Sequence, residues 1–334
     1  MMQDKIELLD VGFLEDKKKL REIDHWLKVF NWPNGWHYDL DIIWALKNIE
    51  DLCLPRGATI IDAGAGLGIT QFILASRGYN VISLDFTKRQ IPRFAKGIFT
   101  IECVDTDLGD YQHEYMSFMT YGQSKAGNSG SVKRNKLNRL RKIFYPKLFY
   151  RNISCIVYIF ANYIHNRFNL FYLSEKIRDH SQFGKIIYLR GTFNSIPLDD
   201  NVADALVSIS AFEHNTYEDM PGSILEFKRI LKPGAPMCIT TGASENKDWY
   251  FKPPKAWNFS QKTLSTWFDI PNDKISFNYR EVFERIKNSK ILNKRMSLFY
   301  KVTGDNALPY GNLKEMKYVP VGILKIKASG QTAL

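Results

Sequence analysis

The sequence predicts an α/β protein in which helices cover a doubly wound, mostly parallel sheet of seven strands. Short β-branched apolar runs alternate with segments of helical periodicity along most of the chain. The first two runs are joined by a glycine-rich turn and a helix, which form a β-α-β unit whose strands should be parallel. The alternation breaks once, over about residues 86–173, which indicates a helical insertion.

The composition is that of a folded globular protein. Of the 334 residues, 45% are hydrophobic and 14% are aromatic, enough to bury a substantial core. The four cysteines are far apart and form no CxxC pair, so we expect neither a disulfide framework nor a metal site. The N-terminus is charged and lacks the apolar region of a signal peptide, which together with the cysteine usage leads us to expect a cytoplasmic protein.

The first 52 residues are expected to form an N-terminal helical extension, ahead of a main domain at residues 53–334. Residues 13–52 carry apolar side chains at three- and four-residue spacing, as in helices with one buried face. The turn from Trp32 to Gly35 divides this stretch. Two helices are therefore predicted before the first strand.

The strands are predicted from short apolar runs bounded by turn residues. They lie at residues 58–63, 80–85, 185–189, 203–209, 237–241, 297–303 and 318–326. Helices are expected near residues 68–77, 174–183 and 220–231, the second capped by Gly184 and the third ended by Lys232-Pro233-Gly234. The insertion would then leave the carboxyl end of the second strand, the edge where open α/β sheets bind ligands, and would cap a site there.

The turn after the first strand reads Asp62-Ala63-Gly64-Ala65-Gly66-Leu67-Gly68. Glycines let the backbone turn tightly and approach a ligand closely, and the following helix offers free amides. A dinucleotide-binding turn would have its third glycine where Ile69 stands, so a nicotinamide cofactor is disfavoured. Asp85 ends the second strand, where an acid can accept hydrogen bonds from both hydroxyls of a ribose.

Two further segments complete an ordered pattern. One begins Arg190-Gly191-Thr192-Phe193 and leads to a strand that ends Ser208-Ile209-Ser210-Ala211-Phe212-Glu213-His214. The other, Arg229-Ile230-Leu231-Lys232-Pro233-Gly234, turns into the next strand. With the glycine turn and Asp85, these segments resemble the class I S-adenosylmethionine-dependent methyltransferases, in particular the type 11-like methyltransferase domain. The resemblance spans residues 58–85 and 186–241.

The resemblance implies a Rossmann-like methyltransferase fold with S-adenosylmethionine as the methyl donor. In such proteins the glycine turn supports the amino-acid end of the donor, and the acid after the second strand binds its ribose. Thr192 stands where many members place an aspartate near the adenine amine, so adenine recognition here would depend more on Phe193. The expected donor-binding residues are Asp62, Gly64, Gly66, Gly68, Asp85, Thr192, Phe193 and Ser210.

His214, at the carboxyl end of the fourth strand, is the expected catalytic base. Methyl transfer to a hydroxyl needs alignment of donor and acceptor and the removal of one proton, for which a histidine is suited. In the resembling families this Glu-His pair often has a structural role, so that alternative stays open. His37 is a second candidate base or a core residue, since N-terminal helices of the family often lie over the donor.

The net charge of +11 is concentrated in the expected insertion. Ten basic residues and no acidic one lie between Glu114 and Glu175, and the rest of the chain is nearly neutral. A basic run at 133–144 precedes an apolar aromatic stretch at 153–164, which is too short to span a bilayer. Three interpretations follow: residues 133–173 contact an anionic membrane, they bind an anionic acceptor or nucleic acid, or they form a helical lid.

The sequence thus predicts methyl transfer from S-adenosylmethionine to a small-molecule, lipid or glycan acceptor, with oxygen as the expected methylated atom. Nucleic acid is less favoured, because the fourth strand is followed by neither of the two motifs of base-methylating enzymes, Asp/Asn-Pro-Pro-aromatic or Pro-Cys. The aromatic residues between Trp249 and Phe259 are candidate acceptor contacts or loop anchors. The alternative function is a non-catalytic, methyltransferase-like binding module at a membrane or partner surface.

Overall fold

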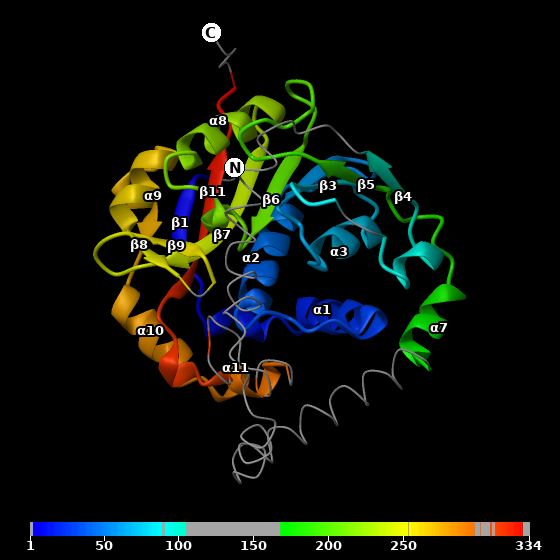
Figure 1. The fold of residues 1–334 in the computed structure, drawn as a ribbon, viewed down its shortest axis with the longest axis horizontal. Coiled ribbons are helices and arrows are strands. Elements are labelled where there is room, and N and C mark those ends of the chain that lie inside the picture. The colour runs from blue at the N-terminus through cyan, green and yellow to red at the C-terminus, as the bar shows by residue number, and fades with distance from the viewer. Residues whose placement is uncertain are drawn as a thin grey trace, which may run out of the picture.

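The computed structural model of the chain describes residues 3–88, 91–104, 168–252, 254–297 and 311–329, with Lys301 and Leu308 in addition. These residues form one central sheet with helices packed against it (Figure 1). The strands are β1 (Lys5–Leu8), β2 (Thr59–Ala63), β3 (Asn80–Asp85), β4 (Ile101–Val104), β5 (Ile186–Arg190), β6 (Ala205–Ile209), β7 (Pro236–Ala243), β8 (Trp249–Phe251), β9 (Ala256–Phe259), β10 (Ile275–Ser276) and β11 (Val319–Ile326). The α-helices are α1 (Lys17–Phe30), α2 (Tyr38–Asp51), α3 (Thr70–Ser76), α7 (Leu170–Lys176), α8 (Met220–Ile230), α9 (Gln261–Phe268), α10 (Tyr279–Lys287) and α11 (Lys290–Arg295).

β2 lies near the centre of the sheet, between β3 and β6, and runs parallel to both. The full order is β10-β1-β11-β7-β6-β2-β3-β5-β4, in which β11 is antiparallel to β1 and β7. The β8–β9 hairpin joins through β9, which pairs with the end of β7. Since the chain continues from β2 to β3 on one side and returns to β6 on the other, the carboxyl ends of these strands flank a point where open α/β sheets bind ligands.

The predicted α/β class with a mostly parallel sheet is confirmed. Six of the seven expected strands coincide with β2, β3, β5, β6, β7 and β11 to within two residues at each end. The strand expected at residues 297–303 is wrong at Lys301, which is helical, while residues 298–300 and 302–303 lie outside the described residues. The sheet has eleven strands among the described residues, because β1, β4, β8, β9 and β10 add two to four residues each. Strands so short show no alternation in a sequence.

The helix predicted at residues 174–183 is wrong in position, since α7 spans Leu170–Lys176. Asn169 begins it, because its side chain accepts a hydrogen bond from the N–H of Tyr172. Gly184 does not cap a helix. It lies ahead of β5, where a Cβ atom would come within 1.9 Å of the Tyr79 backbone oxygen, so glycine is needed for the close passage of two chain segments.

Part of the predicted insertion belongs to the sheet. Residues 91–104 contain a 3-10 turn, η2 (Ala95–Gly97), and β4, which pairs with β5 at the sheet edge. Residues 105–167, which include the basic run and the apolar aromatic stretch, lie outside the described residues. The domain boundaries and the insertion beyond residue 104 therefore stay predictions. Among the described residues, no helix has the length and apolar character needed to cross a membrane.

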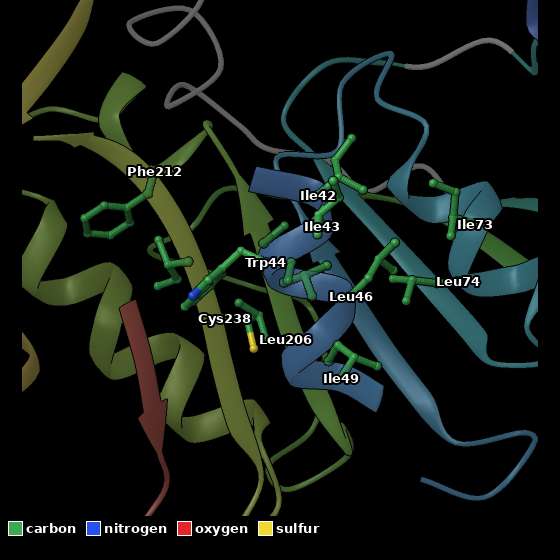
Figure 2. Packing of buried hydrophobic residues seen from close by; sticks show 14 of the residues in the cluster. Ile42, Ile43, Trp44, Leu46, Ile49, Ile73, Leu74, Leu206, Phe212 and Cys238 are labelled. Carbon is green, nitrogen blue, oxygen red and sulfur yellow. The ribbon is translucent and has the colours of Figure 1, made fainter. Parts of the chain in front are cut away.

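The N-terminal segment shares its hydrophobic core with the sheet. β1 pairs with β11, and α2 packs across β6, β7 and β11 (Figure 1). Trp44 of α2 is fully buried against β11, where a Cβ atom at Gly322 would come within 2.4 Å of its ring. Figure 2 shows Trp44 and Leu46 reaching from α2 into the cluster that Leu74 and Leu206 also join. This packing brings the first turn of α2 to the carboxyl end of β6.

Candidate active site

Two cavities lie at the carboxyl ends of β2, β3 and β6. The first, of about 290 Å³, lies between the glycine turn and the segment that precedes α2. The second, also of about 290 Å³, lies between the same turn, the end of β3 and the segment after β5. Gly64, Gly66 and Ser210 line both cavities, so the two are adjoining halves of one cleft.

The backbone of the glycine turn requires glycine at two positions. Gly64 has a φ of 73° and donates its N–H to the Leu84 oxygen at 2.9 Å. A Cβ atom on Gly64 would lie 2.4 Å from the Ala211 Cβ and 2.9 Å from the Phe193 Cζ. Gly66 has a φ of 45°, and a Cβ there would meet only a backbone oxygen at 3.9 Å. Gly66 therefore presents open backbone to the cleft, which permits close approach by a ligand.

Asp62 and Gly68 flank this turn. Asp62, in the last part of β2, is buried and lines the first cavity. Gly68 donates its N–H to the Ala65 oxygen at 2.8 Å, and a Cβ on Gly68 would lie 2.9 Å from that oxygen. The structure thus brings all the predicted residues of the turn to the cleft.

Asp85 ends β3 and lines the second cavity. Its Oδ2 accepts the N–H of Gly66 at 2.9 Å, and its Oδ1 accepts the N–H of Thr87 at 2.9 Å and the Thr87 hydroxyl at 2.6 Å. The carboxylate therefore holds the glycine turn in place. An ionised carboxylate has about four lone-pair positions, and these three contacts use three of them, so Asp85 keeps about one for a ligand hydroxyl.

Thr192 and Phe193 follow β5 and line the second cavity. Thr192 is buried, and its carbonyl oxygen accepts the N–H of Ser195 at 3.3 Å. The Phe193 ring meets the Phe227 ring of α8 edge-on, with centroids 5.2 Å apart. This packing holds an aromatic ring beside the glycine turn, where it can border a flat ligand.

Ser210 follows β6 directly and has a φ of 45°, a left-handed conformation that is costly for a residue with a Cβ atom. Its N–H donates to the backbone oxygen and the hydroxyl oxygen of Thr240, both at 3.1 Å. Its own hydroxyl donates to Asp41 Oδ2 at 3.3 Å. Backbone strain held by such contacts is typical of functional sites, and here it occurs where the two cavities meet.

His214 ends the 3-10 turn η3 (Phe212–His214), is half-buried, and lines the second cavity. Its Nδ1 lies 2.9 Å from the Lys255 backbone oxygen, in the loop between β8 and β9. A carbonyl only accepts, so Nδ1 carries the proton and the neutral ring has its lone pair on Nε2, as a base requires. Burial raises the pKa of the neighbouring Glu213 carboxyl, which favours its neutral form.

His37 is engaged on both ring nitrogens. Its Nδ1 lies 2.6 Å from Asp41 Oδ2, and its Nε2 lies 3.2 Å from the hydroxyl of Tyr318. Trp36 donates its Nε1–H to the same hydroxyl at 3.3 Å. Because His37 is buried and lines neither half of the cleft, the structure favours its alternative role as a core residue over that of a base.

The aromatic side chains between Trp249 and Phe259 largely pack on one another. Trp257 contacts the rings of Tyr217 and Tyr250 at centroid distances of 4.7 and 5.2 Å. The Phe251 ring meets the Tyr318 ring at 6.5 Å. The hairpin they stabilise carries Lys255, so these contacts help to position the carbonyl that orients His214.

Several cleft residues were not predicted as site residues. Thr87 has a recognisable signal, because an Asp-x-Thr turn lets the aspartate accept from the backbone two residues on. Asn34, Gly35 and Tyr38 line the first cavity, although the sequence identified Asn34 and Gly35 only as part of a turn. In the part of the chain that the structure describes, no cluster of three or more His, Cys, Asp or Glu side chains could hold a metal ion.

Part of the chain matches a known protein family. Residues 169–239 match a family model described as a methyltransferase domain. The matched range includes Thr192, Phe193, Ser210 and His214, whereas the glycine turn lies outside it. No curated protein matches the chain in a sequence search.

Several solved structures match the chain at low identity. A putative sarcosine dimethylglycine methyltransferase from Galdieria sulphuraria is 16% identical, with 87% of this chain and 85% of that chain covered and a TM-score of 0.40. Geranyl diphosphate C-methyltransferase from Streptomyces coelicolor A3(2) is 13% identical, with 98% and 92% covered and a TM-score of 0.40. The cyclase SpnF is 10% identical, with 90% and 87% covered and a TM-score of 0.41. Similarities this distant identify no acceptor.

Proposed function

We propose that this chain, which matches a methyltransferase-domain model over residues 169–239, is a class I S-adenosylmethionine-dependent methyltransferase. It binds the donor across both halves of the cleft and methylates a small-molecule, lipid or glycan acceptor at oxygen. The observation that carries the proposal is the meeting of two cavities at Gly64, Gly66 and Ser210. The donor is a nucleoside and an amino acid joined at one sulfonium sulfur. A ligand of two parts fits a cleft of two halves, with the sulfur at their junction.

The residues of the cleft fit the parts of the donor. Asp85 retains about one lone pair for a ribose hydroxyl in the second cavity, and the Phe193 ring borders that cavity for adenine. Gly66 has open backbone facing the junction, so the donor can approach the turn closely. When bound, S-adenosylmethionine supplies an electrophilic methyl group on a cationic sulfur. The chain itself has to position the two ligands, exclude water and accept one proton.

We assign His214 as the base that accepts the proton of the acceptor hydroxyl. The Lys255 carbonyl keeps hydrogen on Nδ1, so Nε2 is the accepting atom in the neutral ring. The ring lines the second cavity beside Ala211, which borders the glycine turn. A hydroxyl acceptor placed between this nitrogen and the junction of the cavities would lose its proton to Nε2 as the new bond to oxygen forms.

Calorimetric titration with S-adenosylmethionine tests the donor site. Replacing Asp85 by alanine should weaken donor binding by about tenfold or more, because it removes the ribose acceptor and releases the Gly66 and Thr87 N–H groups. Glu102→Ala is a charge control, since Glu102 is exposed on β4 and lines neither cavity. Absence of saturable donor binding to the folded wild-type protein, or equal affinity for NAD, would contradict the proposal.

The acceptor is identified by a screen with donor labelled on its methyl group. Phenols, fatty acids, sugars and lipid vesicles are incubated separately with the protein, and the position of the label is determined by mass spectrometry. We expect the label on oxygen. Label found solely on carbon or nitrogen would contradict the proposed chemistry while leaving the donor site intact.

We also propose that residues 133–173 contact an anionic membrane. Of this range, the structure describes residues 168–173, where Phe168, Leu170, Phe171 and Leu173 are exposed apolar side chains. The Lys28 ammonium group lies 5.3 Å from the centre of the Phe171 ring, which adds a cation beside this apolar surface. Apolar groups flanked by cations are suited to the interface of an anionic bilayer.

Replacing Leu170 and Leu173 together by serine should weaken sedimentation with phosphatidylserine-containing vesicles several-fold, because each serine removes apolar area from the interface. Leu225→Ser is the matched control, since Leu225 on α8 is 66% exposed, as Leu170 is 73% exposed, but lies outside the proposed range. Wild-type binding should also weaken as salt is added. Binding that is absent, or that does not respond to salt, would contradict membrane contact.

A further inference from the structure

A buried carboxylate lies directly behind the junction of the two cavities. Asp41, in the first turn of α2, has none of its surface exposed. Its Oδ2 accepts the Ser210 hydroxyl at 3.3 Å and lies 2.6 Å from His37 Nδ1. Its Oδ1 has no hydrogen-bond partner among the described residues. A buried carboxylate with one unsatisfied oxygen is costly, which calls for a functional reason.

The hydrogen bonds around His37 are compatible with a neutral ring beside this carboxylate. Trp36 donates to the Tyr318 hydroxyl oxygen, so the hydroxyl hydrogen is available for His37 Nε2. His37 then accepts on Nε2 and donates from Nδ1 to Asp41, which is the arrangement of a neutral ring. A neutral ring satisfies one lone pair of Asp41 without cancelling its negative charge. Asp41 lies in the first turn of α2, where the helix dipole favours a negative charge.

The other ionisable groups around Asp41 are a carboxyl and two phenols. Glu213 faces it from η3, and Tyr318 and Tyr38 are the phenols nearby. Burial raises the pKa of the Glu213 carboxyl and raises the pKa of the Tyr318 phenol well above its usual value, so both favour their neutral forms. Asp41 is linked to the cleft by its hydrogen bond with Ser210, which lines both cavities.

We propose that Asp41, held by His37 and acting through Ser210, selects the cationic donor S-adenosylmethionine over the neutral product S-adenosylhomocysteine. The inference rests on the proposed function, which puts the sulfonium at the junction that Ser210 lines. The Ser210 hydroxyl donates its hydrogen to Asp41, so toward a ligand in the cleft its oxygen can act only as an acceptor. The negative charge of Asp41, next to the Ser210 oxygen, attracts the positive sulfonium of the donor. The neutral thioether of the product gains no such attraction.

The same arrangement aids turnover. Methyl transfer breaks the bond from sulfur to the methyl carbon, the bonding electrons stay on sulfur, and the positive charge leaves the junction with the transferred group and the released proton. The product is then held without the charge attraction that held the donor. Asp41 and His37 are positioning residues in this account, because neither lines the cleft.

Calorimetric titration of the full chain with each of the two ligands tests the proposal. Asp41→Asn should lower the affinity for S-adenosylmethionine about tenfold, as expected for loss of one unit charge several ångströms away, and leave that for S-adenosylhomocysteine nearly unchanged. Ser210→Gly should act in the same direction, and glycine tolerates the φ of 45° at this position. Asp51→Asn, which removes an exposed carboxylate at the other end of α2, should change neither affinity.

The outcomes separate the two proposals. Equal losses for both ligands in Asp41→Asn, or no loss for either, would overturn the role in selection while the donor site stands. Should Asp41→Asn fail to fold, as judged by its melting transition, the ratio of affinities in Ser210→Gly decides the question. A folded wild-type protein that binds neither ligand would overturn the proposed function, and this inference with it.

Discussion

Replacing Gly64 by alanine is expected to lower the affinity for S-adenosylmethionine at least about a hundredfold, a loss of about 2.7 kcal/mol in binding free energy. The added methyl group would lie 2.4 Å from the Ala211 Cβ and 2.9 Å from the Phe193 ring, so both have to move. Both also line the second cavity, and their displacement alters its wall. The φ of 73° at Gly64 adds backbone strain for any residue with a Cβ atom. Calorimetric titration measures the loss.

Gly57→Ala is the matched control for this substitution. Gly57 has a φ of 79°, close to that of Gly64, yet a Cβ there would meet its nearest atom, the Asn80 side-chain nitrogen, only at 4.0 Å. It lines neither cavity. Gly57→Ala should therefore lose some thermal stability and keep donor affinity. Wild-type donor affinity in Gly64→Ala would show that the glycine turn does not hold the donor.

Replacing His214 by alanine is expected to lower turnover by about 10²–10⁴-fold, the usual contribution of a general base, with little change in donor affinity. The reason is that the proton-accepting Nε2 is lost from the second cavity, whereas the glycine turn and Asp85 are untouched. Turnover is measured as release of S-adenosylhomocysteine with the acceptor found in the labelled-donor screen. Donor affinity is measured by calorimetry on the same preparation.

His180→Ala is the control for loss of a histidine. His180 is likewise half-buried, but it packs on Phe183 and Glu175 beyond the cleft. The His180→Ala variant should therefore retain wild-type turnover. Unchanged turnover in His214→Ala would remove the base assignment and favour the structural role, in which His214 fixes the loop that carries Lys255.

The sequence predicted those parts of the fold in which local pattern and tertiary packing agree. β2, β3 and β7 are largely buried on both faces, so each contains a short apolar run that the sequence reveals. The start of α7 could not be predicted, because it depends on Asn169, whose side chain caps the helix and also donates to backbone oxygens of α1. β10 pairs with β1 at the edge of the sheet, and β1 pairs also with β11. Segments of two and four residues cannot reveal these pairings in a sequence.

The candidate site was predictable where a backbone requirement fixes the residue type. Gly64 and Gly66 take positive φ values, and a sequence records that need directly. Ser210 also takes a positive φ, which nothing in its residue type reveals. The contact between Asp41 and Ser210 joins residues 169 positions apart, so only the packing of α2 on the sheet reveals it. His37 was identified from the sequence as a candidate base or core residue, but its hydrogen-bond partners could be known only from the fold.

The pairing of β11 with both β1 and β7 also affects how the protein is made. Trp36 and Tyr318, which form a hydrogen bond, are 282 positions apart, and Asp4 pairs with Lys325 over 321 positions. During synthesis, Trp44 of α2 can pack against Gly322 only after β11 has emerged. Contacts of such long range slow folding and leave apolar surface uncovered meanwhile. Nascent chains should therefore expose apolar surface of α2 until β11 has left the ribosome.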